Sequence, residues 1–267
     1  MSPTETEHGP ELTVYRGWLD PGKHIWSPFV IKLEARLRFA GVRYETKGGS
    51  LRDAPRGKIP YAELRERGSD SVILADSTLI IKHLVERDIL PNINAQASSP
   101  TVRAQDLAIR ALFEEKLYFY HAWERWTQNY YAMRDRLLSA LIYPKRVIIG
   151  LLLYRHATQM LHDQGTGRYT AAEIRVFRSE IWEAINGLLI SSRARATVNG
   201  APNDQPFWVL EGDHPTEADA TVFGFIVSVL VCTANPESQQ LVKQFPAILD
   251  YAGRIHDRYF PDYAKWE

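Results

Sequence analysis

The segment Gly57 to Ser77 reads GKIPYAELRERGSDSVILADS, and it decides the fold of the first part of this chain. It holds two short apolar-rich runs, Tyr61–Leu64 and Val72–Ala75, separated by the polar, glycine-containing run Arg65–Ser71. Two such runs joined by a polar loop predict a β-hairpin. Because proline has no backbone N–H, Pro60 marks the entrance of the first strand and leaves the backbone beside it free for a ligand.

Asp76 and Ser77 close this segment where a helix is expected to begin. Apolar residues such as Leu79, Ile80 and Leu84 follow them at helical spacing. Asp and Ser are favoured at a helix N-terminus, because their oxygens accept hydrogen bonds from the free backbone N–H groups. The positive end of the helix dipole also attracts anions, so this position suits a ligand carboxylate.

The composition is that of an ordinary globular protein, and it excludes several classes of partner. The 267 residues are 45% hydrophobic and 24% charged, which is enough for a buried core and two modest domains. Lys plus Arg and Asp plus Glu both number 32, so no net charge attracts nucleic acid or an anionic membrane. The expected partner is a small molecule.

The polar N-terminal segment, the single cysteine and the hydropathy together predict a cytoplasmic protein without membrane insertion. The segment Met1–Pro10 is polar and lacks the apolar run of a signal peptide, and a single cysteine forms no disulfide within the chain. The most apolar stretch, Ala220–Cys232, has about 13 residues, whereas a membrane-spanning helix needs roughly 20. This stretch predicts a buried core helix.

The N-terminal part predicts a compact α/β domain at residues 12–90, preceded by a disordered tail at 1–11. Residues 12–15 and 42–46 are apolar and β-branched runs typical of strands. Between them an apolar run at helical spacing follows Ser27-Pro28, which supply an N-cap and a first helical residue. With the hairpin and the helix after it, the domain alternates strands and helices.

The C-terminal part predicts helices alone. Residues 91–102 have the composition of a linker, and residues 103–267 are expected to form an all-α domain. Thr216 followed by Asp219, ahead of the most apolar run, has the form of a capping box. The other expected helices span residues 103–131, 137–162, 170–190 and 246–259.

Several short motifs, in this order, resemble the glutathione transferase superfamily. They are Ser27-Pro28-Phe29, Lys58-Ile59-Pro60, Ala75-Asp76-Ser77 and Pro215-Thr216-Glu217-Ala218-Asp219-Ala220. Two further motifs, Gly165-Thr166-Gly167-Arg168-Tyr169-Thr170 and Arg258-Tyr259-Phe260-Pro261, are similar to the branch named for failed axon connections and metaxin. The resemblance implies a thioredoxin-like N-terminal domain that binds glutathione and an all-helical C-terminal domain that shapes the pocket of a second substrate.

The resemblance also implies roles for individual residues. Pro60 matches the family's cis-proline, and the residue before it, Ile59, would offer its backbone N–H and C=O to the cysteinyl part of glutathione. Asp76 and Ser77 match the pair that holds the γ-glutamyl end: the carboxylate pairs with the ammonium group, and the hydroxyl and helix N-terminus take the carboxylate.

Lys58 and Arg56 are candidates to meet the glycyl carboxylate of glutathione. Each of these residues also fits an ordinary structural role. Loop cations are usually solvated surface charges, Pro60 fits a plain strand entrance, and Asp76 fits a plain helix cap.

Ser27 is the candidate catalytic residue, because glutathione transferases carry Ser or Cys at the matching position. Lowering the pKa of a free thiol from about 8.5 by about two units requires roughly 2.7 kcal/mol. A helix N-terminus supplies up to about 2 kcal/mol and a charged hydrogen bond about 1.5–3 kcal/mol, so Ser27 with its helix suffices. The alternative is a plain N-cap, for which Ser-Pro is well suited.

Thiol–disulfide exchange and metal chemistry do not fit this sequence. A thiol–disulfide reductase needs a nucleophilic cysteine at the position of Ser27 or Val30. Cys232 lies in the predicted apolar helix and is expected to be an inert packing residue. The eight histidines show no spacing typical of metal ligands, so no metal site is expected.

The candidates for the second-substrate pocket are Tyr120, Trp123, His24 and Tyr15. The long predicted helix carries more aromatic side chains than one packing face needs. The family arrangement would direct part of this set, including Tyr120 and Trp123, toward Ser27. Helix and strand aromatics are also common core residues, and a loop histidine commonly faces solvent.

Two classes of function stay open. The first is a glutathione-dependent transferase or isomerase that acts on a small apolar electrophile, for which an aromatic compound is a candidate. The second is a non-catalytic binding or adaptor protein resembling metaxin. Ser27 and Asp76-Ser77 favour the enzyme. The sequence fits a homodimer as well as a monomer.

Overall fold

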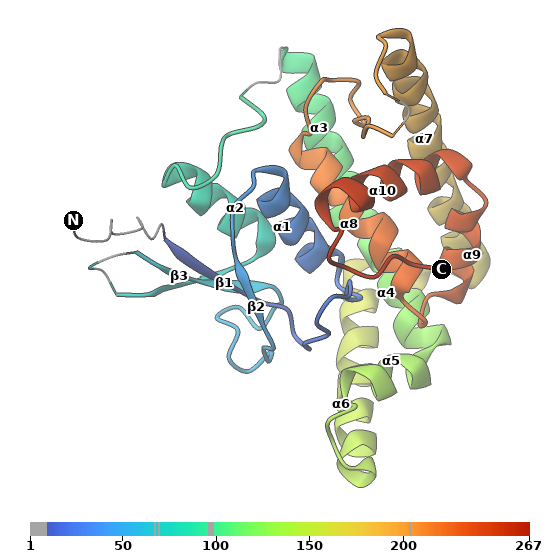
Figure 1. Ribbon diagram of the computed structural model, residues 1–267. Coiled ribbons are helices and arrows are strands. Elements are labelled where there is room, and N and C mark those ends of the chain that lie inside the picture. Colours follow the sequence, from blue (N-terminus) through green and yellow to red (C-terminus); the bar gives the residue numbers. More distant parts are fainter. Residues whose placement is uncertain (1–9, 67, 69, 96–98, 203) are drawn as a thin grey trace.

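The computed structural model describes residues 10–66, 68, 70–95, 99–202 and 204–267 of the chain. These residues form a small mixed sheet with two helices packed on it, joined to a larger helical part (Figure 1). Most of the tail predicted at residues 1–11 lies outside the described residues, and the first strand begins at Glu11.

Four strands form the sheet in the order β2-β1-β3-β4. They are β1 (Glu11–Tyr15), β2 (Glu45–Lys47), β3 (Tyr61–Arg65) and β4 (Val72–Ala75). β1 and β2 are parallel, and the other neighbours are antiparallel. The predicted hairpin is confirmed, with Tyr61 opposite Ala75. A parallel pair followed by a hairpin is the thioredoxin-like arrangement that the resemblance implied.

The second strand begins later than the predicted residue 42. The Val42 N–H donates to the Leu37 carbonyl at 3.0 Å, which extends the end of the preceding helix. Tyr44 then accepts a hydrogen bond from Arg38 Nε at 2.8 Å. Because these contacts hold residues 42–44 against the helix, pairing with β1 starts only at Glu45.

Helices α1 (Pro28–Phe39) and α2 (Ser77–Glu86) pack on one face of the sheet. Their apolar faces and alternate strand residues form one buried cluster. It consists of Leu12, Val14, Leu33, Leu37, Ala62, Leu64, Ile80, Ile81, Leu84 and Leu90. Both predicted helices of the α/β domain are therefore present, with their N-termini at Ser27 and Asp76.

A long helical rod opens the C-terminal part. It comprises α3 (Pro100–Leu112), the π-helical turn η1 (Phe113–Leu117), α4 (Tyr118–Trp123) and the π-helical turn η2 (Glu124–Gln128). The helix predicted at 103–131 thus starts earlier and ends earlier. Its end at Asn129 separates it from α5 (Tyr130–Leu137).

The residues predicted as a linker are tied to the helical part where they are described. The Asn94 amide donates to Asp106 Oδ2 at 2.8 Å, and its oxygen accepts from the Glu217 N–H at 3.2 Å. The Pro91 carbonyl accepts from the Arg36 guanidinium. Side-chain contacts therefore hold this connection, which its composition did not indicate.

The next two helices differ from their predicted bounds. α6 (Tyr143–Gln164) begins later than residue 137 because a turn between Leu138 and Leu141 separates it from α5. α7 (Ala171–Val198) continues past the predicted end at residue 190, because Ser192 is buried and donates to the Val209 carbonyl. Between them Gly165 adopts a left-handed φ of 109°, which ends α6.

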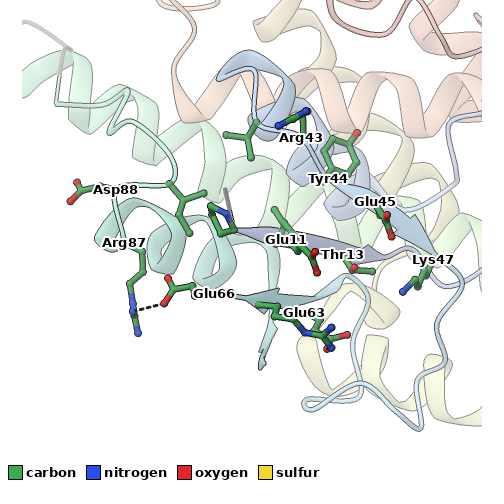
Figure 2. A pocket seen from close by; sticks show the side chains of 15 residues that line it. Glu11, Thr13, Arg43, Tyr44, Glu45, Lys47, Glu63, Glu66, Arg87 and Asp88 are labelled. Carbon is green, nitrogen blue, oxygen red and sulfur yellow. Dashed lines mark hydrogen bonds and ion pairs between the residues drawn. The ribbon is translucent and has the colours of Figure 1, made fainter. Parts of the chain in front are cut away.

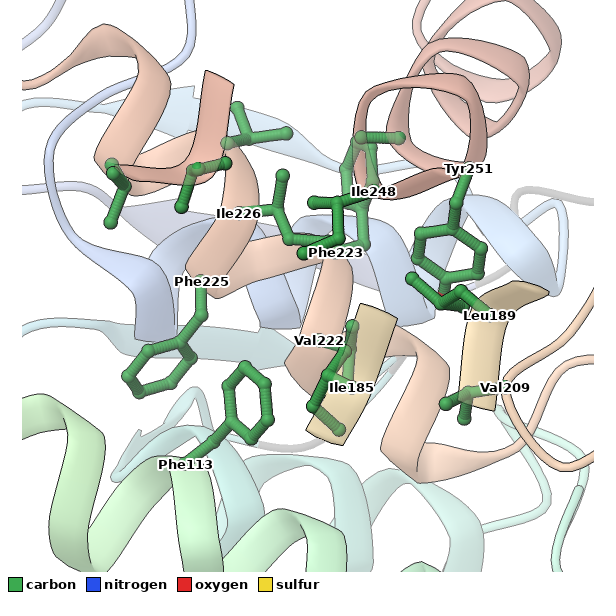
Figure 3. Close-up of a cluster of buried hydrophobic side chains, with 14 of the residues drawn as sticks. Phe113, Ile185, Leu189, Val209, Val222, Phe223, Phe225, Ile226, Ile248 and Tyr251 are labelled. Atoms are coloured by element: carbon green, nitrogen blue, oxygen red, sulfur yellow. The ribbon is translucent and has the colours of Figure 1, made fainter. Parts of the chain in front are cut away.

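The apolar helix α8 (Glu217–Val231) is the centre of the helical part, with every residue from Ala218 to Leu230 buried. Figure 3 shows its side chains between Phe113, helix α7 and helix α10 (Pro246–Tyr259). The predicted capping box is confirmed: Asp219 Oδ2 accepts hydrogen bonds from the Thr216 N–H and hydroxyl.

None of the described helices is, by itself, long and apolar enough to cross a membrane. Helix α8 passes that test only together with α9 (Pro236–Lys243), across a bend of 117°. Because α8 is buried in the core, the apolar character of this pair is explained by packing.

Candidate functional site

Ser27 lies at the N-terminus of α1, half-buried. Its Oγ accepts a hydrogen bond from the Val30 N–H, but at 3.4 Å this cap bond is long. The hydroxyl hydrogen is not used by this bond, so it can be donated to a ligand. The sequence-predicted N-cap is confirmed, and its geometry leaves Ser27 able to act as a donor.

Three buried polar side chains hold the backbone immediately before Ser27. The Trp26 carbonyl accepts hydrogen bonds from Arg125 Nη1 at 3.1 Å and from the Ser228 hydroxyl at 2.6 Å. Arg125 is fixed in turn by Ser228 and by the Asn235 amide oxygen. These residues come from η2, α8 and the loop before α9, so the helical domain fixes the start of α1. The sequence analysis missed them, because only the fold brings them together.

The Ile59-Pro60 peptide bond is cis, as the resemblance implied. Ile59 packs with Ala75 and Tyr61 beside the end of the hairpin. Within the described part of the chain, neither its N–H nor its carbonyl has a hydrogen-bond partner. A backbone donor and acceptor next to each other are therefore available to a ligand peptide.

Asp76 is the N-cap of α2, and its two carboxylate oxygens differ. Oδ1 accepts from the N–H groups of Thr78 and Leu79 at 3.0 and 3.2 Å. Oδ2 has no partner among the described residues. The backbone of Asp76 has a φ of 74°, a left-handed value that is costly for a residue with a side chain. Ser77, buried, follows as the first residue of the helix.

Two contacts bring these elements together. The pairing of Tyr61 with Ala75 places the cis-proline beside the start of α2. Lys32, on α1, donates to the Thr78 hydroxyl of α2 at 2.8 Å. The N-termini of the two helices are therefore neighbours, with the Ile59 backbone at the adjoining strand end.

The two predicted loop cations lie at the surface. Arg56 and Lys58 are both exposed, in the loop that leads from β2 to the cis-proline. Neither forms an ion pair within the described chain. They stay free to meet a ligand carboxylate, and they equally fit solvated surface charges.

Tyr15 is placed in the sheet. Its ring stacks on Tyr61 at 4.3 Å, and its hydroxyl donates to Glu63 at 3.1 Å. Burial raises the pKa of Tyr15, with the Glu63 contact adding to the effect. The structure gives Tyr15 a packing role in place of the predicted one at the substrate pocket.

His24 is buried against the C-terminal segment. Its Nε2 lies 3.1 Å from His256 Nδ1, and its ring packs among Phe223, Phe260 and Tyr263. Burial lowers the pKa of His24 to about 3, and His256 contributes in the same direction. His24 is therefore a neutral packing residue. It neither faces solvent nor has the predicted role in the substrate pocket.

The face of the rod that meets α1 is not the face predicted. Tyr120 stacks toward Phe177 of α7, and Trp123 packs on the large core cluster. The contacts with α1 instead run antiparallel along the rod: Lys32 with Glu114, Phe29 with Tyr118, and the Trp26 carbonyl with Arg125. Tyr118 is thus the rod aromatic beside the Ser27 helix. At about 100° per residue, positions 114, 118 and 125 lie within about 40° of one another, whereas Tyr120 and Trp123 lie on another side of the rod.

An aromatic and cationic group lies on the other side of Trp26. Trp18 packs edge-on against Trp26, with 5.9 Å between the ring centroids, and Arg136 of α5 lies over both rings. Arg136 also pairs with Asp20. No spacing in the sequence signalled this group, since its members are more than one hundred positions apart.

A hollow with a volume of about 930 Å³ lies elsewhere in the described structure (Figure 2). It is formed by the strand ends and the turn after α2, and Glu11, Lys47, Glu63 and Arg87 are among its labelled lining residues. Acidic and basic side chains alternate around it, so it presents no coherent charge to a ligand. It does not include Ser27, Ile59 or Asp76.

The residues at the two helix N-termini fit the chemistry of glutathione. The tripeptide offers a backbone amide to the Ile59 N–H and carbonyl, and an ammonium and carboxylate to Asp76 Oδ2 and the start of α2. The Ile59 N–H and carbonyl and Asp76 Oδ2 lack partners within the described chain, whereas the N–H groups of Thr78 and Leu79 at the start of α2 donate to Asp76 Oδ1. A donor set with unsatisfied backbone groups and one free carboxylate oxygen matches such a ligand.

Comparisons with known proteins match both parts of the chain. The family model described as glutathione S-transferase N-terminal domain matches residues 28–133, and the model described as glutathione S-transferase, C-terminal domain matches residues 205–255. Together they cover more than half of the chain.

Two relatives match over most of the sequence. The chain is 28% identical to the isoprene-epoxide–glutathione S-transferase of Rhodococcus sp. (strain AD45), over 87% of this chain and 92% of that protein. It is 23% identical to Failed axon connections of Drosophila melanogaster, over 89% of this chain. In that second case it spans only 55% of the relative's length.

The fold is also that of solved structures. A glutathione transferase homologue from Sulfitobacter, solved with bound glutathione, superposes with a TM-score of 0.52 at 13% identity, covering 94% of each chain. The family models and the sequence relatives agree with the family that the sequence motifs resembled. The protein belongs to the glutathione transferase superfamily, with Failed axon connections among its relatives.

Proposed function

We propose that this protein is a glutathione-dependent transferase, with Ser27 as the residue that stabilises the glutathione thiolate. The observation that carries the proposal is the meeting of two helix N-termini, at Ser27 and Asp76, beside a cis peptide whose backbone groups lack partners. The 28% identity to a glutathione S-transferase over nearly its full length supports it.

In this proposal the chain holds glutathione through backbone and acidic groups. The Ile59 N–H and carbonyl bind the cysteinyl part, beside Pro60. Asp76 Oδ2 pairs with the γ-glutamyl ammonium while Oδ1 continues to cap α2, and Ser77 takes the carboxylate. The exposed Lys58 and Arg56 meet the glycyl carboxylate.

Ser27 then acts on the sulfur. Its hydroxyl donates a hydrogen bond to the thiolate, and the N-terminus of α1 adds the positive end of the helix dipole. Arg125 and Ser228 keep the Trp26 carbonyl, and with it the start of α1, in place. Glutathione, when bound, supplies a sulfur nucleophile: a carbon–sulfur bond forms at an electrophilic carbon, an epoxide carbon–oxygen bond opens, and the oxygen takes a proton from water.

The second substrate in this proposal is a small apolar electrophile. The identity to an isoprene-epoxide–glutathione S-transferase favours an epoxide or a similar reactive carbon. Trp18, Trp26 and Phe29 are aromatic side chains of α1 and the loop before it, and Tyr118 of α4 packs on Phe29; such side chains suit an apolar group. An isomerase would use the same groups and expel glutathione again in a second step.

A non-catalytic glutathione-binding role is the second candidate. The identity to Failed axon connections favours it, because that relative is not named as a transferase. In this case Asp76 and Ile59 would still bind glutathione, and Ser27 would only cap α1. The two candidates therefore differ in the state of the bound sulfur.

The test is the ultraviolet absorbance of bound glutathione thiolate against pH. We expect Ser27→Ala to raise the pKa of the bound thiol by about one to two units, the loss of a charged hydrogen bond. Ser99→Ala is the matched control, because Ser99 is also the N-cap of a Ser-Pro helix start, and its Oγ accepts from Val102 at 3.2 Å.

Identical titrations for wild type, Ser27→Ala and Ser99→Ala would remove Ser27 from the mechanism. If glutathione also bound normally in all three, the non-catalytic role would stand. A shift in the Ser27 variant alone supports the transferase.

A further inference from the structure

The start of α6 and the turn before it form a tip that projects from the helical part (Figure 1). We call residues 138–152 the α6 tip. Unlike the rest of the surface, the tip exposes a dense set of large apolar side chains. They are Ile142, Tyr143, Ile148, Ile149, Leu151 and Leu152.

The apolar side chains of the tip surround the helix. Only Gly150 in this part of α6 is buried, and it packs so closely on Arg134 and Tyr130 of α5 that no Cβ would fit. Ile148 and Leu152 are 63% and 62% exposed on the opposite side. At about 100° per residue, these apolar positions cover far more than the one face that α5 needs. The chain itself leaves this apolar surface uncovered among its described residues.

The charged side chains within the tip are all basic, and Asp135 of α5 pairs with one of them, Arg146, at 3.8 Å. From Arg136 to His162 the sequence contains no Asp or Glu, although the whole chain has 32 acidic residues. Lys145 and Arg155 lie exposed on either side of the apolar positions and form no ion pair in the described structure. The neutral net charge of the chain thus hides a local basic and apolar surface.

We propose that the α6 tip docks on an anionic lipid bilayer. An exposed apolar helix end flanked by unpaired cations combines the two interactions that hold peripheral proteins to such surfaces: apolar side chains enter the headgroup boundary, and Lys or Arg side chains meet lipid charges. Tyr131 and Tyr143 are exposed on either side of Arg134, and tyrosine is favoured at membrane interfaces.

The charge distribution argues against a second copy of the chain as the occupant. A two-fold interface brings the same patch of both copies together. At the tip this would place Lys145 and Arg155 of one copy near those of the other, with no acidic side chain from 136 to 162 to compensate. A bilayer with anionic headgroups supplies the missing negative charge.

The docking differs from insertion across the membrane. Helix α6 is not long and apolar enough to cross a bilayer, and Lys145 and Arg155 lie within it. The tip would therefore lie at the interface. It is joined to the candidate site through α5, whose Arg136 lies over Trp18 and Trp26. This arrangement would hold the site near a surface in which apolar compounds concentrate.

The experiment is cosedimentation of the full chain with vesicles of phosphatidylcholine containing about 30% phosphatidylglycerol, against pure phosphatidylcholine vesicles. We expect binding to the anionic vesicles that weakens as salt rises from about 0.05 to 0.5 M. Lys145→Gln with Arg155→Gln should weaken it by about 30-fold, at roughly 1 kcal/mol per cation. Ile148→Ser with Leu152→Ser should weaken binding to the anionic vesicles at least about tenfold, at low and at high salt.

Matched controls come from the rest of the surface. Val176→Ser removes an apolar side chain that is as exposed as Ile148, at 63%. Lys82→Gln with Lys243→Gln removes two exposed cations outside the tip. Neither control should change vesicle binding. Melting temperatures of all variants establish that each is folded.

Absence of binding to anionic vesicles at low salt would overturn the proposal. So would equal losses in tip and control variants. A change of sedimentation velocity from dimer to monomer in the Ile148 and Leu152 variant, without vesicle binding by the wild type, would assign the tip to a second copy. Failure of glutathione binding would leave the vesicle result unaffected, since no residue of the candidate site lies in the tip.

Discussion

Two helices of this protein begin with the same dipeptide in different surroundings. Helices α1 and α3 both start at Ser-Pro, and in both the serine hydroxyl accepts a hydrogen bond from the third helical N–H. At Ser99 that bond is 3.2 Å. At Ser27 the bond is 3.4 Å, and Arg125 and Ser228 hold the preceding carbonyl. Local sequence starts a helix, but tertiary contacts decide whether its first residue can serve a ligand.

The largest expected effect comes from removing the group that distinguishes the two starts. Arg125→Met leaves the Asn235 oxygen without its buried donor and takes one of two donors from the Trp26 carbonyl. We expect a loss of about 3 kcal/mol in the free energy of unfolding. Urea denaturation measures it. Arg155→Met, an exposed arginine on α6, is the control and should cost less than about 0.5 kcal/mol. Equal losses would mean that Arg125 does not clamp α1.

The second effect concerns His24, three residues before Ser27. Its folded pKa is about 3 against an ordinary value of 6.5, because of burial first, then His256, Arg16 and Arg38, with Asp262 opposing. Below about pH 6.5 the unfolded chain binds a proton that the folded chain does not. The free energy of unfolding therefore has its full value above pH 6.5, and it falls by up to about 1.4 kcal/mol per pH unit toward pH 3. At pH 5 the loss is about 2 kcal/mol.

Thermal or urea unfolding between pH 7 and 4.5 measures this slope. His256 is buried with a lowered pKa and adds to this slope in the same direction. In His24→Phe the slope should decrease, whereas in His156→Gln, an exposed control on α6, it should not. An unchanged slope in His24→Phe would show that other groups govern the acid response.

The third effect concerns Asp76, at the start of α2. Asp76→Ala removes both the cap of α2 and the free Oδ2 that we assign to the ligand ammonium. We expect glutathione affinity to fall by about 10- to 100-fold, a loss of roughly 1.5–3 kcal/mol, and stability by about 1 kcal/mol. Calorimetric titration with glutathione measures the affinity. Asp76→Asn keeps a cap oxygen and should restore stability but not affinity. If affinity stayed unchanged while stability fell, Asp76 would be a cap alone.

The smallest effect is the stability cost of each serine. Because the Ser27 bond is longer, Ser27→Ala should cost about 0.5 kcal/mol and Ser99→Ala about 1 kcal/mol. Urea denaturation of the two variants, compared directly, measures the difference. A larger cost at Ser27 would show that its hydroxyl serves α1 more than the ligand.

Features that depend on neighbours in the sequence could be predicted. The starts at Ser27 and Asp76, the hairpin and the capping box from Thr216 to Asp219 each involve residues a few positions apart. Their physical causes, orphan N–H groups and alternating burial, act locally. The cis peptide before Pro60 came from the family resemblance and not from local chemistry.

Features that depend on distant partners could not be predicted. Lys32, Glu34 and Arg36 of α1 are all buried, which the apolar periodicity of that helix did not indicate. Each is paired with a group from another element: Glu114, Arg16 and Glu217 respectively. His24 is likewise explained only by His256 and the C-terminal aromatics. A charge is buried where the fold supplies a partner, and the sequence does not show which partner that is.

The glutathione-binding residues, the second substrate, the cytoplasmic location and the oligomeric state stay predictions. For Tyr120 and Trp123 the structure shows a different face. Regular helical spacing puts Tyr118 and Arg125 on one side of the rod and Tyr120 and Trp123 on another, and the sequence does not show which side meets α1.

The two π turns also bear on how insertions and deletions would act in this rod. A π turn holds one residue beyond the α-helical pattern, so it can be described as a tolerated single-residue insertion. Deleting one residue within Phe113–Leu117 would remove this extra residue and restore regular geometry. Arg125 would then stay approximately on the side of the Trp26 carbonyl. A relative with a regular helix here would need a gap of one position at each turn before its aromatic residues could be compared with those of this chain.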